Sequence, residues 1–136
     1  MIKMLVGEKG SGKTKTMLAA VGEAVREDHG AVIFINKGDR HVYDLDYNVR
    51  LVNTEEFSCH SFDMVYGLLS GILTSNYDIT HIFMDSITKI VGSSDIEELE
   101  KFITMADELA ARFNITLYMT VSMSQDNLTE GLRKYL

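Results

Sequence analysis

Short apolar runs alternate with longer amphipathic stretches along this chain. The runs lie at residues 2–6, 31–35, 82–85 and 115–121. Runs of this kind are typical of strands that are buried on both faces of a parallel sheet. Between them, an apolar side chain recurs every three or four positions, which predicts helices over about residues 13–28, 61–75 and 94–114.

Local signals mark the ends of these elements. Gly30 is expected to cap the first helix, and Asn114 is expected to end the third. Residues 94–97, Ser-Asp-Ile-Glu, have the pattern of a capping box. Residues 49–52 alternate in polarity and predict a short edge strand, and residues 125–136 predict a short helix at the end.

The alternation of strands and helices predicts an α/β fold. We expect three αβα layers, with helices on both faces of a mostly parallel central sheet. A chain of 136 residues can bury one substantial core, so we expect residues 1–136 to form a single domain.

A glycine-rich loop stands between the first strand and the first helix. Residues 7–14, Gly-Glu-Lys-Gly-Ser-Gly-Lys-Thr, match the phosphate-binding pattern G-x-x-x-x-G-K-S/T. Its glycines let the backbone curl so that N–H groups point into one concavity, and the helix that follows adds the positive end of its dipole. The strand before the loop and the helix after it are the context that this mechanism requires.

The loop indicates a nucleoside triphosphate site that uses Mg²⁺. Lys13 supplies a charge for the β- and γ-phosphates, and the Thr14 hydroxyl can ligate Mg²⁺. The candidate phosphate-binding residues are Gly7, Glu8, Lys9, Gly10, Ser11, Gly12, Lys13, Thr14 and Lys15.

Asp85 is the second candidate site residue. It ends the apolar run at residues 82–85, and the carboxyl ends of parallel strands are where open α/β sheets bind ligands. We therefore expect Asp85 to hold the Mg²⁺ shell beside Thr14 and, with Lys13, to serve catalysis. An ordinary turn aspartate after a strand is the alternative.

Composition narrows the class of partner. The net charge is −7, and the lysines and arginines are scattered along the sequence, so a nucleic-acid footprint is not supported. A single cysteine, Cys59, excludes an internal disulfide and favours a reducing, cytoplasmic setting. The sequence holds no apolar run long enough to span a membrane.

With these motifs the chain resembles the RecA-like group of P-loop NTPases. The resemblance rests on residues 7–14, on Phe34-Ile35-Asn36 at the end of the second strand, and on residues 82–86, where Ser86 follows Asp85. Thr120-Val121-Ser122 falls where the group places a polar sensor. It implies a core with the P-loop strand beside the strand at 116–121 and the Asp85 strand beyond that, here truncated after the sensor strand.

The chain departs from that group in one respect. RecA-like ATPases carry a glutamate that polarises the attacking water just past the second strand, and this sequence has Asn-Lys-Gly-Asp at residues 36–39. Asp39 and Glu55 are candidate substitutes. The implied activity is slow or partner-activated ATP hydrolysis, or a nucleotide switch, because losing a water-positioning base costs orders of magnitude in rate.

Two other functions stay open. A nucleoside or nucleotide kinase shares the loop, although Ser86 and the single cysteine differ from the thymidine kinases that the chain also resembles. A non-catalytic interaction module that nucleotide stabilises is the third. ATP is favoured over GTP because no guanine-reading Asn-Lys-x-Asp is present. A homo-oligomer or protein partner could complete the site with an arginine. The candidates are Arg40, Arg50, Arg112 and Arg133.

Overall fold

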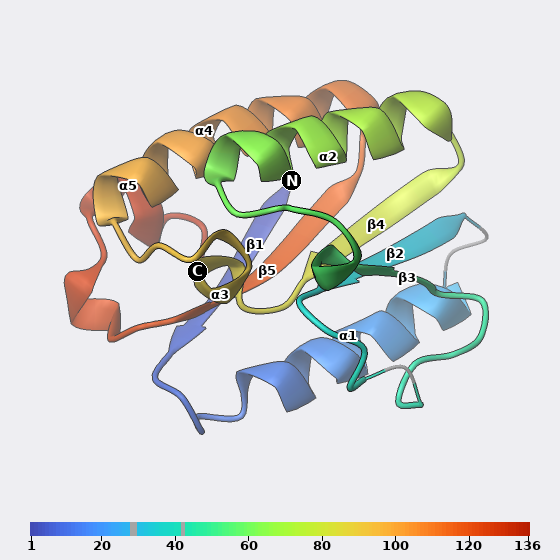
Figure 1. The fold of residues 1–136 in the computed structure, drawn as a ribbon, viewed down its shortest axis with the longest axis horizontal. Coiled ribbons are helices and arrows are strands. Elements are labelled where there is room, and N and C mark those ends of the chain that lie inside the picture. The colour runs from blue at the N-terminus through green and yellow to red at the C-terminus, as the bar shows by residue number, and fades with distance from the viewer. Residues whose placement is uncertain (28–29, 42) are drawn as a thin grey trace.

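The computed structural model describes residues 1–27, 30–41 and 43–136. Within these residues, five parallel strands form one sheet in the order β1-β5-β4-β2-β3 (Figure 1). The strands are β1 (Ile2–Gly7), β2 (Ala31–Asn36), β3 (Arg50–Asn53), β4 (Ile79–Met84) and β5 (Thr116–Ser122). The helices are α1 (Lys13–Glu27), α2 (Phe62–Ser75), α3 (Ile87–Val91), α4 (Ile96–Phe113) and α5 (Glu130–Arg133), with short 3₁₀ turns η1 (Thr54–Glu56) and η2 (Gln125–Asn127).

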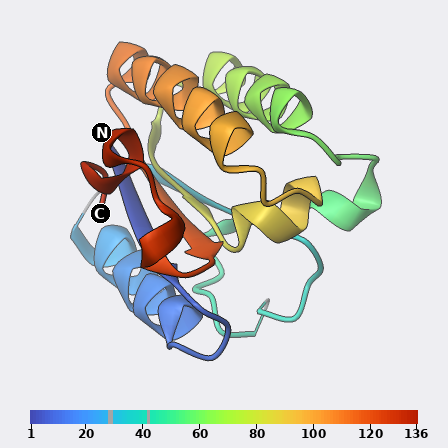
Figure 2. The ribbon, with the colours of Figure 1, turned by 90° about the vertical axis from the view of Figure 1, so that its left-hand side faces the viewer.

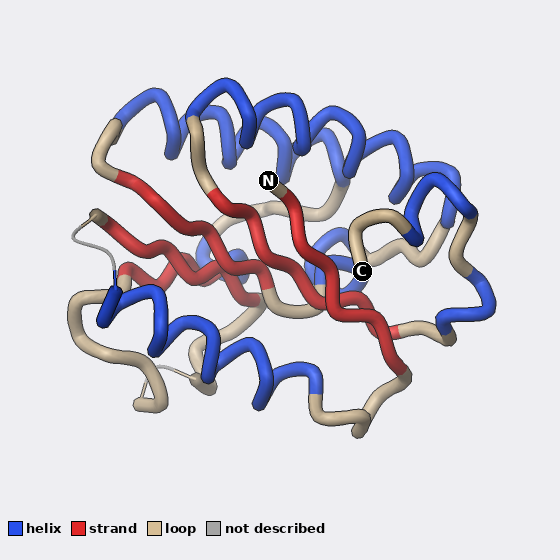
Figure 3. The backbone as a smooth tube through the Cα atoms, turned by 180° about the vertical axis from the view of Figure 1, so that it is seen from behind, coloured by secondary structure: helices blue, strands red, loops and turns tan. Residues whose placement is uncertain are grey.

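Helices cover both faces of this sheet, as the alternation predicted. Helix α1 lies on one face, while α2 and α4 lie side by side on the other (Figures 1 and 3). The larger core fills the space under α2 and α4 and includes Leu69, Ile103 and Met119, which are almost fully buried. The smaller core, around Met17 and Phe34, lies between α1 and the sheet. The α/β class and the layering are therefore confirmed.

The strand order puts the two candidate motifs at the same end of the sheet. β5 pairs with β1 on one side and with β4 on the other, which confirms the neighbours expected for the P-loop strand and the Asp85 strand. All five strands are parallel, so their carboxyl ends meet at one edge. At that edge the P-loop follows β1, Asn36 ends β2, and Asp85 follows β4.

Some element ends differ from the expectations. Asp95 caps α4 in place of Ser94, because its carboxylate oxygen Oδ1 accepts from the N–H groups of Glu97 and Glu98 at 2.9 and 3.2 Å. Asn114 ends α4 in the left-handed conformation, as expected. The short helix α3 was missed because its five residues are too few to show a period.

Gly30 has a steric role beside the sheet. A side chain there would collide with the backbone carbonyl of Asp78 and with Thr80, so glycine is needed for the close approach of β2 to β4. The expected end of the first helix at Asp28 lies outside the described residues.

The end of the chain packs against the outer edge of β1. The Met4 N–H donates to the Tyr135 carbonyl at 2.8 Å, and the Gln125 side chain donates to the Val6 carbonyl at 3.0 Å. Figure 2 shows this tail beside β1. The single helix expected at residues 125–136 is instead η2 followed by α5, with Gly131 inside α5. The tail thus covers part of the outer edge of β1.

None of the described helices is long and apolar enough to cross a membrane.

Candidate functional site

The glycine loop joins the end of β1 to the start of α1. Gly10 and Gly12 have φ angles of 86° and 87°, in the left-handed region where a side chain is strained. Gly7 faces Ser11 so closely that a Cβ would lie 2.5 Å from the Ser11 hydroxyl oxygen. The loop is closed by a turn in which the Ser11 N–H donates to the Glu8 carbonyl at 3.1 Å. Each glycine of the motif therefore has a backbone reason to be there.

Lys13 and Thr14 form the first turn of α1 and are half-buried. The Lys13 ammonium folds back over the loop and donates to the Glu8 carbonyl at 3.0 Å. The Thr14 hydroxyl points the other way, across the cleft, and donates to both carboxylate oxygens of Asp85 at 3.3 and 3.2 Å. Lys13 thus holds its charge at the loop, and Thr14 ties the loop to β4.

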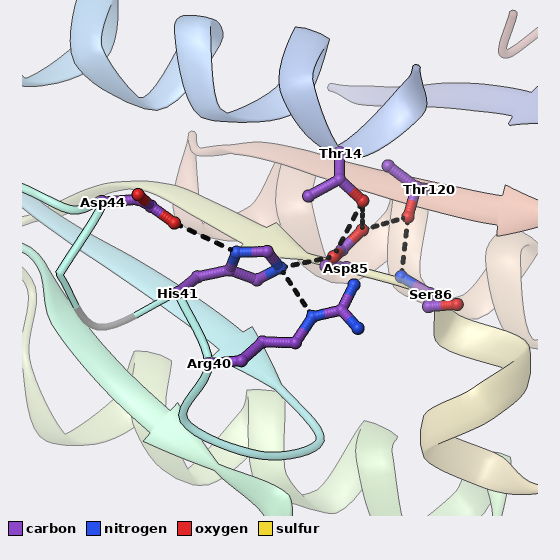
Figure 4. A network of polar contacts seen from close by, with 7 residues as sticks. All are labelled: Thr14, Arg40, His41, Asp44, Asp85, Ser86 and Thr120. Carbon is purple, nitrogen blue, oxygen red and sulfur yellow. Dashed lines mark hydrogen bonds and ion pairs between the residues drawn. The ribbon is translucent and has the colours of Figure 1, made fainter. Parts of the chain in front are cut away.

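Asp85 is the centre of a network of polar contacts (Figure 4). Only 4 % of the residue is exposed. The fully buried Thr120 hydroxyl donates to Asp85 Oδ1 at 2.7 Å and accepts from the Ser86 N–H at 2.6 Å. Because Thr14 and Thr120 come from α1 and β5, this carboxylate links three elements at the carboxyl edge of the sheet.

Ser86 carries backbone strain next to Asp85. Its φ and ψ angles are 61° and 65°, which is the left-handed region that residues other than glycine rarely adopt. This conformation turns the Ser86 N–H toward Thr120 and starts α3 directly after β4. Strained residues that the surrounding structure holds in place cluster at functional sites.

Arg40 and His41 bring a second group of side chains to Asp85. His41 Nε2 lies 3.7 Å from Asp85 Oδ2, and its Nδ1 lies 3.4 Å from Asp44 Oδ2. Arg40 Nε donates to His41 Nε2 at 3.2 Å. The Arg40 bond needs an unprotonated Nε2, whereas an ion pair with Asp85 needs a protonated one, so the two contacts belong to different charge states of His41.

A cleft of about 870 Å³ opens beside this network, and Thr14, Arg40 and Asp85 are among the residues that line it. That volume is within the roughly 300–1,000 Å³ common for ligand sites. Among the described residues, five cationic side chains and one carboxylate, that of Asp85, line the cleft. The cationic residues are Lys9, Lys13, Lys15, Arg40 and Lys89. A basic cleft in a chain of net charge −7 favours an anionic ligand, because like charges gathered in one concavity reinforce each other's field.

The structure separates the expected phosphate-binding residues into two groups. Lys9, Gly10, Gly12, Lys13, Thr14 and Lys15 line the cleft with Asp85. Gly7, Glu8 and Ser11 face a hollow of about 510 Å³ on the other side of the loop, beside Ser124 and Gln125. Gly12 and Lys13 border both. The loop therefore borders both the cleft and the neighbouring hollow.

The proposed substitutes for the missing glutamate do not reach the cleft. Neither Asp39 nor Glu55 is among the described residues that line it. Of the arginine candidates, Arg40 lines the cleft of its own chain, and Arg133 donates to the Gln125 carbonyl at 2.8 Å instead. Arg50 and Arg112 lie in β3 and in the last turn of α4, outside the lining.

Sequence reasoning did not assign site roles to several lining residues. Asn36 is one of them, at the end of β2, and Lys89 of α3 is another. Thr120 and Ser122 were singled out only through the resemblance, and both line the cleft. Their position at the ends of strands could have identified some of these residues from the sequence. Asn36, Asp85 and Ser122 each come at the carboxyl end of a parallel strand, where open α/β sheets bind ligands.

The Thr14 hydroxyl and the Asp85 carboxylate are oxygen ligands that suit a hard cation, provided that a bound ligand supplies further oxygens. One hydroxyl and one carboxylate give too few oxygens for an all-protein cage, and the described residues contain no cluster of three or more metal-binding side chains. Mg²⁺ is commonly bound by one or two protein oxygens together with phosphate oxygens and water. These residues therefore fit Mg²⁺ only when a phosphate ligand is also present.

Cys59 has no part in this chemistry. Its side chain is buried, and burial raises the pKa of the thiol, which lowers the fraction of reactive thiolate. Cys59 lies before α2, and it does not line the cleft.

Comparison with known proteins does not assign this chain to a family. No protein-family model matches it, and a search of curated proteins finds no match either. The functional argument therefore rests on the loop, the carboxylate network and the charge of the cleft.

Proposed function

We propose that this protein binds a nucleoside triphosphate with Mg²⁺ in the cleft between the glycine loop and Asp85. The observation that carries the proposal is that five cationic side chains of the described residues surround the glycine loop at the start of α1. In this loop Gly10 and Gly12 have left-handed backbone conformations. Backbone N–H groups and a helix N-terminus in that arrangement attract phosphate oxygens. Lys13 leaves the Glu8 carbonyl to pair with a phosphate.

Thr14 and Asp85 supply the protein side of the Mg²⁺ site. They already lie within 3.3 Å of each other, and Thr120 fixes the carboxylate from behind. Mg²⁺ held by these two residues would supply positive charge that offsets the charge of the phosphate groups. ATP is favoured over GTP because the sequence lacks a guanine-reading motif. The single buried cysteine is compatible with a reducing, cytoplasmic setting.

We propose the RecA-like group of P-loop NTPases as the family. The placement of β5 between the P-loop strand and the Asp85 strand supports this assignment, as does the contact of Thr120 with Asp85 at the expected sensor position. The described residues after β5 form η2 and α5 and add no further strand.

The same geometry supports slow hydrolysis or a switch over rapid turnover. Asp85 is the only carboxylate among the described residues that line the cleft, and its oxygens already accept bonds from Thr14 and Thr120. The described residues place no second carboxylate there to orient a water molecule. A neighbouring subunit or a partner would have to bring the missing group, which is the case for partner-activated ATPases.

A kinase remains the second candidate because of another cavity. It measures about 250 Å³, lies between the start of α2 and α4, and shares Ser93 with the cleft. Its lining includes Tyr66, Glu98 and Lys101, which can recognise a polar acceptor. A phosphoryl acceptor seated there would approach the cleft from the α3 side. A non-catalytic module that nucleotide stabilises is the third candidate.

Titration calorimetry with ATP and with GTP, each with and without Mg²⁺, tests the proposal. We expect Mg²⁺-dependent ATP binding that weakens at least about tenfold in Lys13→Ala, since a charge-assisted bond is lost. Lys3→Ala is the matched control, because Lys3 is exposed on β1 outside the cleft. A folded protein that binds neither nucleotide would refute the proposal.

Turnover assays then separate the three candidates. Phosphate release that rises per molecule with protein concentration indicates sites shared between subunits. Release that is independent of concentration indicates a self-contained ATPase. Phosphate transfer to an added nucleoside or nucleotide indicates a kinase, and tight binding with no turnover indicates the module.

A further inference from the structure

One buried polar atom at the cleft has no partner. Asn36 ends β2, only 6 % of it is exposed, and it lines the cleft with Lys13, Thr14 and Asp85. Its amide nitrogen Nδ2 is enclosed and makes no hydrogen bond within the described structure. Buried side-chain donors are nearly always bonded in folded proteins, so such an exception calls for an explanation at a functional site.

The backbone around Asn36 is held firmly, although its amide donor is not. The strand β2 is bonded between β3 and β4, and the Asp85 N–H donates to the carbonyl of the preceding residue, Ile35, at 3.1 Å. Beyond Asn36 the chain turns away at Gly38, whose φ angle is 111° and whose N–H donates to Asn53 Oδ1 at 2.8 Å. Asn36 is therefore a fixed position from which an unbonded donor can reach the cleft.

The strand order fixes what Asn36 faces. Ile35 pairs with Met84, so Asn36 and Asp85 are the next residues on two adjacent strands. Thr14 reaches Asp85 from the loop side. A γ-phosphate placed between Lys13 and the Thr14–Asp85 pair lies on the same side of the sheet edge as Asn36, whereas the α- and β-phosphates lie along the loop.

We propose that Asn36 is the residue that distinguishes a nucleoside triphosphate from a diphosphate, by donating its Nδ2–H to a γ-phosphate oxygen. This inference rests on the proposed function. Rotation about χ2 of asparagine is broad, and no bond restrains Nδ2, so the amide can turn its donor toward the ligand. An amide donates to phosphate but takes no proton from water. Asn36 therefore senses the γ-phosphate without activating its hydrolysis.

The test compares the affinities for a non-hydrolysable ATP analogue and for ADP, both with Mg²⁺, by calorimetry. Asn36→Ala removes the donor. Asn36→Asp keeps the shape and replaces the donor with a charged acceptor. We expect both variants to lose about ten- to hundredfold in affinity for the analogue, the range for one charge-assisted hydrogen bond, and to keep the affinity for ADP within about threefold.

Asn53→Asp is the matched control. Asn53 is the register partner of Asn36 on β3, and its Oδ1 accepts from Gly38 and Glu55 at 2.8 and 2.9 Å, roles that a carboxylate keeps. It does not line the cleft. We expect Asn53→Asp to change both affinities equally or not at all, although it adds the same charge one strand away.

The outcomes separate this inference from the proposed function. If the wild-type protein binds neither nucleotide, the proposed function fails. If the wild type binds both and the Asn36 variants weaken both equally, or weaken neither, the proposed function stands and Asn36 does not read the γ-phosphate. Thermal melting of each variant shows that it is folded, and the isosteric Asn36→Asp decides the matter if Asn36→Ala unfolds.

Discussion

Replacing Thr120 with valine tests the network that holds Asp85. The change swaps a hydroxyl for a methyl group of nearly the same size, at a side chain that is fully buried. Asp85 Oδ1 then loses the bond at 2.7 Å, and the Ser86 N–H loses the acceptor at 2.6 Å. Asp85 keeps the weaker contacts from Thr14 at 3.2 and 3.3 Å.

The two losses set the expected magnitude. A hydrogen bond to a charged group contributes about 1.5–3 kcal/mol, and a buried N–H left without a partner costs about 1–3 kcal/mol. The extra methyl group offsets part of this, since it adds apolar contact in a buried position, at about 0.8 kcal/mol. We therefore expect Thr120→Val to lower the free energy of unfolding by about 2–5 kcal/mol.

Urea unfolding followed by circular dichroism measures this change, with the slope of the transition as a check that the unfolded state is unaltered. Thr120→Ser is a control that keeps both bonds, and Thr116→Val makes the same substitution at a half-buried position of β5 outside the network. Both controls should cost no more than about 1 kcal/mol. A loss below about 0.5 kcal/mol for Thr120→Val would show that the network does not fix Asp85.

Three further predictions concern the rest of the molecule. Gly67 lies in the middle of α2 with open space where a Cβ would go, so Gly67→Ala should raise the free energy of unfolding by about 0.5–1 kcal/mol. Gly92 caps α3 with a φ angle of 71°, so Gly92→Ala should lower the free energy of unfolding by about 1 kcal/mol. Equal effects of the two substitutions in urea unfolding would contradict this. Burial raises the pKa of the Cys59 thiol, so a disulfide reagent at pH 8 should react more slowly with the native protein than with the urea-unfolded one, and equal rates would contradict it. Burial and the nearby Asp107 raise the pKa of Tyr135 above its usual 10. The stability that the neutral Tyr135 side chain contributes is therefore present below pH 10 and is lost as the pH rises through the raised pKa. Tyr135→Phe should remove this decline in stability at alkaline pH and cost about 0.5–1 kcal/mol at neutral pH.

The hydrophobic pattern predicted most of the fold because the inner strands β2, β4 and β5 are largely buried on both faces. Such strands appear as unbroken apolar runs, and α2 and α4 show their buried faces at regular spacing. α3 escaped prediction, since a five-residue helix shows no period. The steric role of Gly30 could not be predicted, because a glycine required by a neighbouring strand looks, in sequence, like one that caps a helix.

The parts of the site that one local motif determines could be predicted from the sequence. The parts that residues far apart in the sequence form together could not. The left-handed conformations of Gly10 and Gly12 follow from the local motif. The basic character of the cleft does not, because Lys9, Arg40 and Lys89 are scattered in sequence and come together only when β1, β2 and β4 align. The unpartnered amide of Asn36 is likewise a property of packing, which no pattern of residue types reveals.

A crystal structure of the protein with a non-hydrolysable ATP analogue and Mg²⁺ would test the nucleotide site most directly. We predict the triphosphate against the backbone N–H groups of residues 10–14, with Mg²⁺ beside the Thr14 hydroxyl and within reach of Asp85. A nucleotide seated instead in the cavity between α2 and α4, or a triphosphate that leaves the glycine loop empty, would contradict the proposed site.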